Sequence, residues 1–166
     1  MLCNARRGDG THGSGTVHVV SGPPCSGKTT FVSRNRAEGD VVIDMDAIAQ
    51  ALGFGQAHGA SGSYLRVALA ARAGAIAEVL RKRCGAWIIH TQPSPEDVAR
   101  YESCGAVLHV LDPGIDECLR RAEADARPDG TADAIRKWYG APAAARLTET
   151  NKRKRDVALT QPFEDW

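Results

Sequence analysis

Residues 16–30 of the chain read TVHVVSGPPCSGKTT, and this stretch decides the fold. It opens with a short run rich in β-branched residues, which favours a buried strand. A Gly-Pro-Pro break follows, and a helical pattern over residues 29–37 comes after it. The eight residues 22–29 fit the pattern G-x-x-x-x-G-K-[ST] between that strand and that helix. This context is the one that a phosphate-binding loop requires.

The residue types of this loop suit phosphate. Glycines let the backbone curl so that successive N–H groups point into one concavity, and the following helix adds its positive end. Lys28 is placed to reach the β- and γ-phosphates of a nucleotide, and the Thr29 hydroxyl to join the shell of Mg²⁺. The plain alternative is a Gly-Pro turn with a chance lysine, which the flanking elements disfavour. Cys25 is expected to fill space, because a thiolate would repel phosphate. The predicted ATP-binding residues are Gly22, Pro23, Pro24, Cys25, Ser26, Gly27, Lys28, Thr29 and Thr30.

Length and charge bound the rest of the chain. The 166 residues suit one domain, and we expect it over 16–150, between a flexible leader (1–15) and a polar tail (151–166). Without the leader and tail, 15 basic and 16 acidic residues remain, a balance too neutral for a protein that coats nucleic acid. No apolar run approaches the roughly 18–20 residues of a membrane span, and no signal peptide is visible. The sequence therefore predicts a cytoplasmic protein without membrane contact.

Short apolar runs alternate with helical patterns along the domain. Such alternation predicts parallel strands joined by helices, hence a three-layer α/β/α fold whose ligands bind at the carboxyl ends of the strands. Strands are predicted at 16–21, 40–43, 86–91 and 106–111, and helices at 29–37, 46–52, 64–83, 95–103, 115–126 and 132–139. The longest helix is predicted to bury one face made of Leu65, Leu69, Ala73, Ile76 and Leu80.

Two carboxylates follow the second predicted strand, in the sequence VVIDMD over residues 41–46. If the strand runs through Asp46, Asp44 and Asp46 share a face. Asp46 is also well placed to cap the next helix, which is its structural alternative. Facing the phosphate loop, such a carboxylate accepts the proton of an attacking hydroxyl or helps to hold Mg²⁺. We expect Asp46 to be the base and Asp44 to serve the metal or the substrate.

Arginines gather near the end of the domain, before and within the loop RPDG at residues 127–130. Phosphoryl transfer needs cations on the developing charge, and arginines beside a lid loop supply them. The plain alternative is a solvated helix face with Glu117–Arg121 and Glu123–Arg127 pairs. We favour Arg127 and then Arg121 as catalytic, and Arg120 as a surface residue. His90, at the end of the third strand, either forms hydrogen bonds at the rim or faces the phosphates.

Four stretches in this order resemble the polynucleotide-kinase-like P-loop kinases: GPPCSGKTTF, VVIDMDAIAQ, WIIHTQPSPED and CLRRAEADARPDGTADAIRKWY. The resemblance covers roughly residues 17–140. It implies a parallel sheet in the order 2-3-1-4 with a helical lid, use of ATP and Mg²⁺, and transfer of the γ-phosphoryl group to a hydroxyl. Residue by residue, it implies Lys28 and Thr29 as the loop lysine and metal-binding hydroxyl, Asp46 as the general base and Arg127 as the lid arginine.

The chain departs from that family at two positions. Ala49 stands where the family has an arginine that grips the substrate phosphate, and His90 stands where it has an aspartate. We expect a kinase acting on the 5′-hydroxyl of a nucleic acid end or on a nucleoside or nucleotide. A version acting on single nucleosides or nucleoside monophosphates would hold the acceptor with Arg66 or Arg72. The two departures also motivate a different class, an ATP-driven switch or assembly factor without a phosphoryl acceptor.

Overall fold

A computed structural model describes residues 15–55 and 62–141 of the chain. The predicted leader, apart from Gly15, and the predicted tail lie outside these residues, as does the end of the predicted domain from 142 to 150. The domain boundaries therefore stay a prediction.

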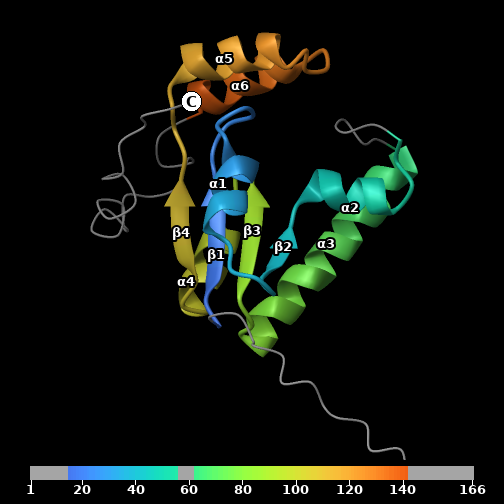
Figure 1. The fold of residues 1–166 in the computed structure, drawn as a ribbon, viewed down its shortest axis with the longest axis vertical. Coiled ribbons are helices and arrows are strands. Elements are labelled where there is room, and N and C mark those ends of the chain that lie inside the picture. The colour runs from blue at the N-terminus through green and yellow to red at the C-terminus, as the bar shows by residue number, and fades with distance from the viewer. Residues whose placement is uncertain (1–14, 56–61, 142–166) are drawn as a thin grey trace, which may run out of the picture.

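Four parallel strands form the centre of the molecule (Figure 1): β1 (Val17–Ser21), β2 (Val41–Ile43), β3 (Ala86–His90) and β4 (Val107–Val110). Their order is β2-β3-β1-β4, so the predicted parallel sheet and its strand order are confirmed. Ser21 is in register with His90 on one side and Val110 on the other. The carboxyl ends of the three strands are therefore level, and the loops after them meet at one edge.

Helices cover both faces of this sheet, as predicted. One face packs against α3 (Gly62–Lys82) and α4 (Pro95–Ser103), with Ile88, Ile76 and Tyr101 in the shared core. The other packs against α1 (Lys28–Asn35), whose Val32 is buried with Val20 and Trp87. Three helices lie at the carboxyl edge: α2 (Met45–Ala51), α5 (Ile115–Ala124) and α6 (Thr131–Gly140). In Figure 1, α5 and α6 form a lid across the strand tips.

An aromatic stack fills the sheet face under α1. The rings of His18 and Trp87 lie parallel with centroids 4.1 Å apart, and Phe31 meets Trp87 edge-on. His18 Nδ1 and His109 Nε2 share a hydrogen bond of 3.0 Å across β1 and β4. Burial lowers the pKa of His109 to about 4 and also lowers the pKa of His18. The two imidazoles are partly buried and are therefore neutral at neutral pH.

The predicted buried face of the longest helix is right only towards its C-terminal end. Ile76 and Leu80 are buried, but Leu65 and Leu69 are 37% and 49% exposed, and Ala73 is exposed as well. Only the C-terminal half of α3 crosses the sheet. Its N-terminal half extends past the strand tips beside α2, and we call these two segments, residues 45–51 and 62–71, the arm (Figure 1). Periodicity in the sequence gives the face of a helix but not the length of sheet that covers it.

None of the helices within residues 15–55 and 62–141 combines the length and apolar character of a bilayer span.

Candidate active site

The loop between β1 and α1 has the backbone of a phosphate cradle. A Cβ on Gly22 would lie 2.3 Å from the Leu111 carbonyl oxygen, so only glycine fits there. Cys25 and Gly27 both have positive φ, at 62° and 89°. No side chain caps the N-terminus of α1, so its first N–H groups face the loop with the positive end of the helix dipole. This is the geometry that binds phosphate at a helix N-terminus.

Lys28 lies inside this loop. Its ammonium donates to the carbonyl oxygens of Gly22 at 2.9 Å and Pro23 at 2.5 Å, and its distance to the Ser26 hydroxyl is 3.4 Å. Burial lowers the pKa of Lys28 to about 8, against the opposing effect of Cys118, Cys25 and Asp44. Across residues 15–55 and 62–141, the hydrogen bonds of this ammonium are made to neutral oxygens. A desolvated cation of this kind is well suited to an anionic ligand, because phosphate oxygens would return the lost solvation.

The lid places one arginine directly on this loop. Arg121 Nη1 lies 3.5 Å from the Cys25 carbonyl oxygen, and its Nε donates to Glu117 at 2.6 Å. Buried Cys118 and Ala122 of α5 pack with Cys25, which joins the lid to the loop. Cys25 thus fills space as expected, and burial raises the pKa of its thiol.

The other lid arginines take different positions. Arg127 follows α5, and its Nη2 lies 3.7 Å from Asp125 Oδ2. The positive charge of Arg127 still acts on the loop, since it opposes protonation of both Lys28 and Cys25. Arg120 is exposed and pairs with Glu117, as its surface position predicted. Arg121 and Arg127 therefore lie on the loop side of the lid, and Arg120 does not.

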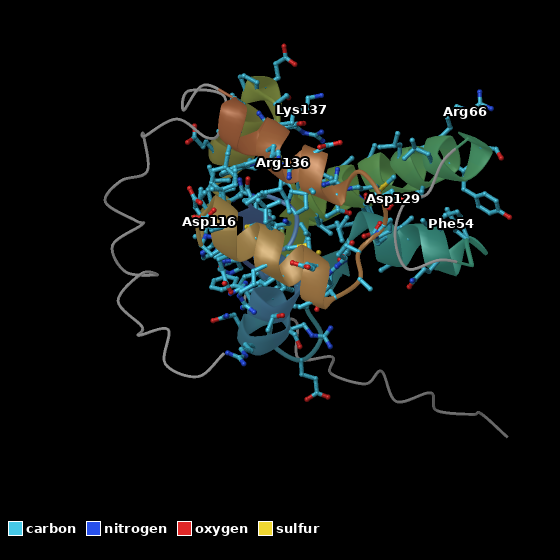
Figure 2. All side chains as sticks on the ribbon, turned by 90° about the horizontal axis from the view of Figure 1, so that it is seen from above. Phe54, Arg66, Asp116, Asp129, Arg136 and Lys137 are labelled. Carbon is cyan, nitrogen blue, oxygen red and sulfur yellow. The ribbon has the colours of Figure 1, made fainter. Side chains whose placement is uncertain are left out.

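Two aromatic side chains fix the lid to the sheet edge. Trp138 Nε1 donates to the Thr91 carbonyl oxygen at 3.0 Å, just past the end of β3. The Tyr139 hydroxyl donates to Asp112 Oδ1 at 2.6 Å, just past the end of β4. The loop that carries Asp129, between α5 and α6, is at the end of the lid nearer the arm (Figure 2). The lid arginines are thus held in place through α6.

The carboxylates after β2 correct two expectations. The strand ends at Ile43 and α2 begins at Met45, so Asp44 and Asp46 share no strand face. Asp44, not Asp46, caps α2, and its Oδ1 accepts the Asp46 N–H at 3.0 Å. The helix begins at Met45, one residue earlier than predicted, because Asp44 supplies the cap itself. The negative charge of Asp44 acts on Lys28, which places it on the side of the phosphate loop.

His90 occupies the hydrogen-bonded rim position considered for it. Its Nε2 lies 2.8 Å from the Tyr101 hydroxyl of α4, and burial lowers the pKa of the imidazole to about 4, with Arg72 acting in the same direction. Arg72 of α3 also reaches the end of β3. Its Nη2 donates to the Ile89 carbonyl oxygen at 2.9 Å. The sequence did carry a signal for Arg72, a lone arginine on the helix face that holds Ala68 and Ile76.

Comparison with solved structures identifies the architecture. A chain of the Pnkp1/Rnl/Hen1 RNA repair complex aligns with a TM-score of 0.59 at 18% identity, over 78% of this chain and 44% of that chain. The chain has a P-loop kinase fold. A second structure of the Pnkp1/Rnl/Hen1 complex gives a TM-score of 0.51 at 21% identity, over 68% of this chain and 40% of that one.

Other comparisons give a weaker structural match or no match. The tunicamycin resistance protein of Deinococcus radiodurans gives a TM-score of 0.43 at 19% identity, over 75% of this chain and 80% of that one. No family model and no curated protein matches the sequence. The chain spans less than half the length of the RNA repair chains that it resembles, so the likeness concerns the fold.

Proposed function

We propose that the chain is an ATP-dependent kinase that transfers the γ-phosphoryl group to a hydroxyl of a nucleic acid end, a nucleoside or a nucleotide. One observation carries the proposal. The phosphate loop, with Lys28 inside it, is contacted by a lid arginine, Arg121, and has the carboxylate of Asp44 within electrostatic range. A loop that only binds nucleotide needs neither a lid cation nor a carboxylate on the acceptor side, whereas phosphoryl transfer uses both.

The residues of the loop fit ATP and Mg²⁺. The curled backbone and the N-terminus of α1 suit the phosphates, and Lys28 can neutralise them. The Thr29 hydroxyl, in the first turn of α1, and the Asp44 carboxylate are the groups proposed for Mg²⁺. Bound Mg²⁺ would supply charge neutralisation for the nucleotide phosphates. The lid arginines Arg121 and Arg127 would stabilise charge on the transferred group.

A general base is proposed among the two carboxylates after β2. Asp46 lies in the first turn of α2 and is half-buried, and it remains our choice for removing the proton of the acceptor hydroxyl. Asp44 caps the same helix and faces the charge of Lys28, which suits a metal or substrate contact. As the carboxylate takes the proton, the acceptor oxygen gains negative charge and attacks the γ-phosphorus. ADP is the leaving group.

The test measures transfer of radiolabelled γ-phosphate from ATP to 5′-hydroxyl oligonucleotides, nucleosides and small alcohols. We expect transfer by the wild-type chain, and loss of transfer with retained ATP binding in Asp46→Asn. Asp44→Asn is the comparison, since it keeps a side-chain oxygen that can cap α2. Transfer that survives in Asp46→Asn but not in Asp44→Asn would move the base to Asp44. Hydrolysis at a rate that no hydroxyl compound changes would refute the kinase and favour an ATP-driven switch.

A further inference from the structure

Glu117 lies in the first turn of α5, and two arginines of the same helix bind its carboxylate. Arg120 donates from Nε to Oε2 and from Nη2 to Oε1, both at 2.8 Å. Arg121 donates from Nε to Oε1 at 2.6 Å. The arginines follow the glutamate by three and four positions, so the three side chains share one helix face. Glu117 is therefore the common anchor of both arginines.

The two arginines differ in what else they reach. The Arg120 side chain is 66% exposed, and an ion pair at such a position contributes little. The Arg121 side chain is 21% exposed, and its Nη1 lies 3.5 Å from the Cys25 carbonyl oxygen. A Cβ on Gly27 would lie 3.4 Å from the same nitrogen. The Glu117 carboxylate thus holds one end of the Arg121 guanidinium, while the other end lies over the phosphate loop.

Positive charge gathers at this loop. The charges of Arg127 and Lys28 act on the Cys25 thiol and oppose the effect of burial on its pKa. The charge of Arg121 acts on the same thiol in the same direction. Three cations that converge in this way repel one another until an anion lies among them. An arginine side chain also gains conformational entropy when it swings into solvent. Both effects favour withdrawal of Arg121 from the loop before nucleotide binds.

The Glu117 carboxylate opposes that withdrawal. Hydrogen bonds from Arg120 and Arg121 lower its pKa to about 2, so its negative charge is present throughout the neutral range. The short bond to Arg121 Nε offsets the repulsion that this side chain meets from Lys28 and Arg127. Because a guanidinium is planar and rigid, contacts at Nε and at Nη1 fix its direction as well as its place.

We propose that Glu117 is a positioning residue, which holds the Arg121 guanidinium over the phosphate loop so that it meets the γ-phosphate of the incoming nucleotide. The inference rests on the proposed function, because it concerns the lid arginine of the same site. Glu117 acts through Arg121 and needs no contact of its own with nucleotide or acceptor. The alternative is a pair that only stabilises α5, as glutamate and arginine do at this spacing on any exposed helix.

The first experiment is a double-mutant cycle on the full chain in the phosphoryl transfer assay. The variants are Glu117→Ala, Arg121→Ala and the combination of the two. Glu123→Ala is the matched control, because Glu123 is an exposed glutamate of the same helix. Thermal melting of each variant verifies that the fold is retained.

We expect Glu117→Ala to lower kcat roughly tenfold, because a misplaced cation no longer stabilises charge on the transferred group. In the Arg121→Ala background the same change should cause no further loss, since the group that it positions is gone. Glu123→Ala should match the wild type. An equal fold loss from Glu117→Ala in both backgrounds, or no loss in the wild-type background, overturns the positioning role.

Binding separates this inference from the proposed function. Calorimetry compares Mg-ADP with the magnesium complex of a non-hydrolysable ATP analogue, which carries the additional γ-phosphate. We expect the wild type and Glu123→Ala to prefer the ATP analogue, and Glu117→Ala and Arg121→Ala each to lose roughly tenfold of that preference. This result supports the positioning role even where no acceptor is phosphorylated and the kinase proposal fails.

Three outcomes of the calorimetry overturn the positioning role, whether or not transfer occurs. The first is a preference for the ATP analogue that survives in Glu117→Ala. The second is a loss of preference in Glu123→Ala as large as that in Glu117→Ala. The third is a wild type that binds both nucleotides equally.

Discussion

Gly22→Ala should damage both the stability of the chain and its nucleotide binding. The added Cβ would lie 2.3 Å from the Leu111 carbonyl oxygen and 2.8 Å from the Ser26 hydroxyl. The Ser26 side chain can rotate away, but the Leu111 oxygen belongs to the backbone. That backbone is held in place, because the Leu111 N–H donates to the Ser21 carbonyl oxygen at 2.8 Å. Relief therefore requires the phosphate loop to move away from the end of β4. Overpacking of this kind costs about 2 kcal/mol.

For a chain of this size, that loss lowers the melting temperature by roughly 4–8 °C. The movement also shifts the Gly22 carbonyl oxygen that holds the Lys28 ammonium. We expect the stabilisation by Mg-ATP, measured as a shift in melting temperature, to fall well below that of the wild type. Differential scanning calorimetry with and without Mg-ATP measures both effects in one series.

Gly74→Ala is the matched control with the opposite sign. Gly74 lies in α3, and a Cβ there meets nothing within 4 Å. Alanine in an exposed helix interior should stabilise by about 0.5–1 kcal/mol, because it removes the excess backbone entropy of glycine. Gly22→Ala melting within 1 °C of the wild type, with unchanged nucleotide binding, would refute the close approach of the loop to β4.

Two further predictions concern the partly buried histidines and the lid. Burial holds the pKa of His90 and of His109 at about 4, below the ordinary 6.5 of an unfolded chain, so protonation favours unfolding. The free energy of unfolding should be constant above about pH 6.5 and fall towards pH 4, by up to about 3 kcal/mol for each histidine. Urea unfolding from pH 7.5 to 4 measures this fall. A free energy that does not change with pH contradicts the prediction. Arg121→Ala should lower the rate of phosphoryl transfer at least tenfold, since its guanidinium contacts the loop, while Arg120→Ala, on an exposed arginine, should leave the rate unchanged. Equal rates of the two variants in the transfer assay would contradict that role for Arg121.

Much of the fold is local in origin and was accessible from the sequence. The break after Ser21 and the pattern up to Thr29 depend on neighbouring residues, and the structure has the strand, loop and helix that they predict. The order of the strands came from a resemblance of four stretches, because periodicity carries no information on which strands pair. The structure has that order as well.

The site was less accessible, because its details depend on where elements end. Because α2 begins at Met45, one residue earlier than predicted, Asp44 rather than Asp46 caps it. The exposure of Leu65 depends on the sheet ending beneath α3. His18 and His109 are 91 residues apart in the chain, and only their places on β1 and β4 bring the two rings together. Contacts of such range leave no pattern in a single sequence.

The bonds from Trp138 to Thr91 and from Tyr139 to Asp112 have a consequence for the order of events in turnover. They hold the lid as a fixed bracket, so folding itself has already met the entropic cost of orienting the arginines. Nucleotide would meet charges that are already oriented. A lid that opened to admit ATP or to release ADP would have to break the bond from the buried indole of Trp138, which is 3% exposed. We therefore expect nucleotide to enter and leave with little movement of the lid, so that closure around ATP does not limit the speed of the cycle.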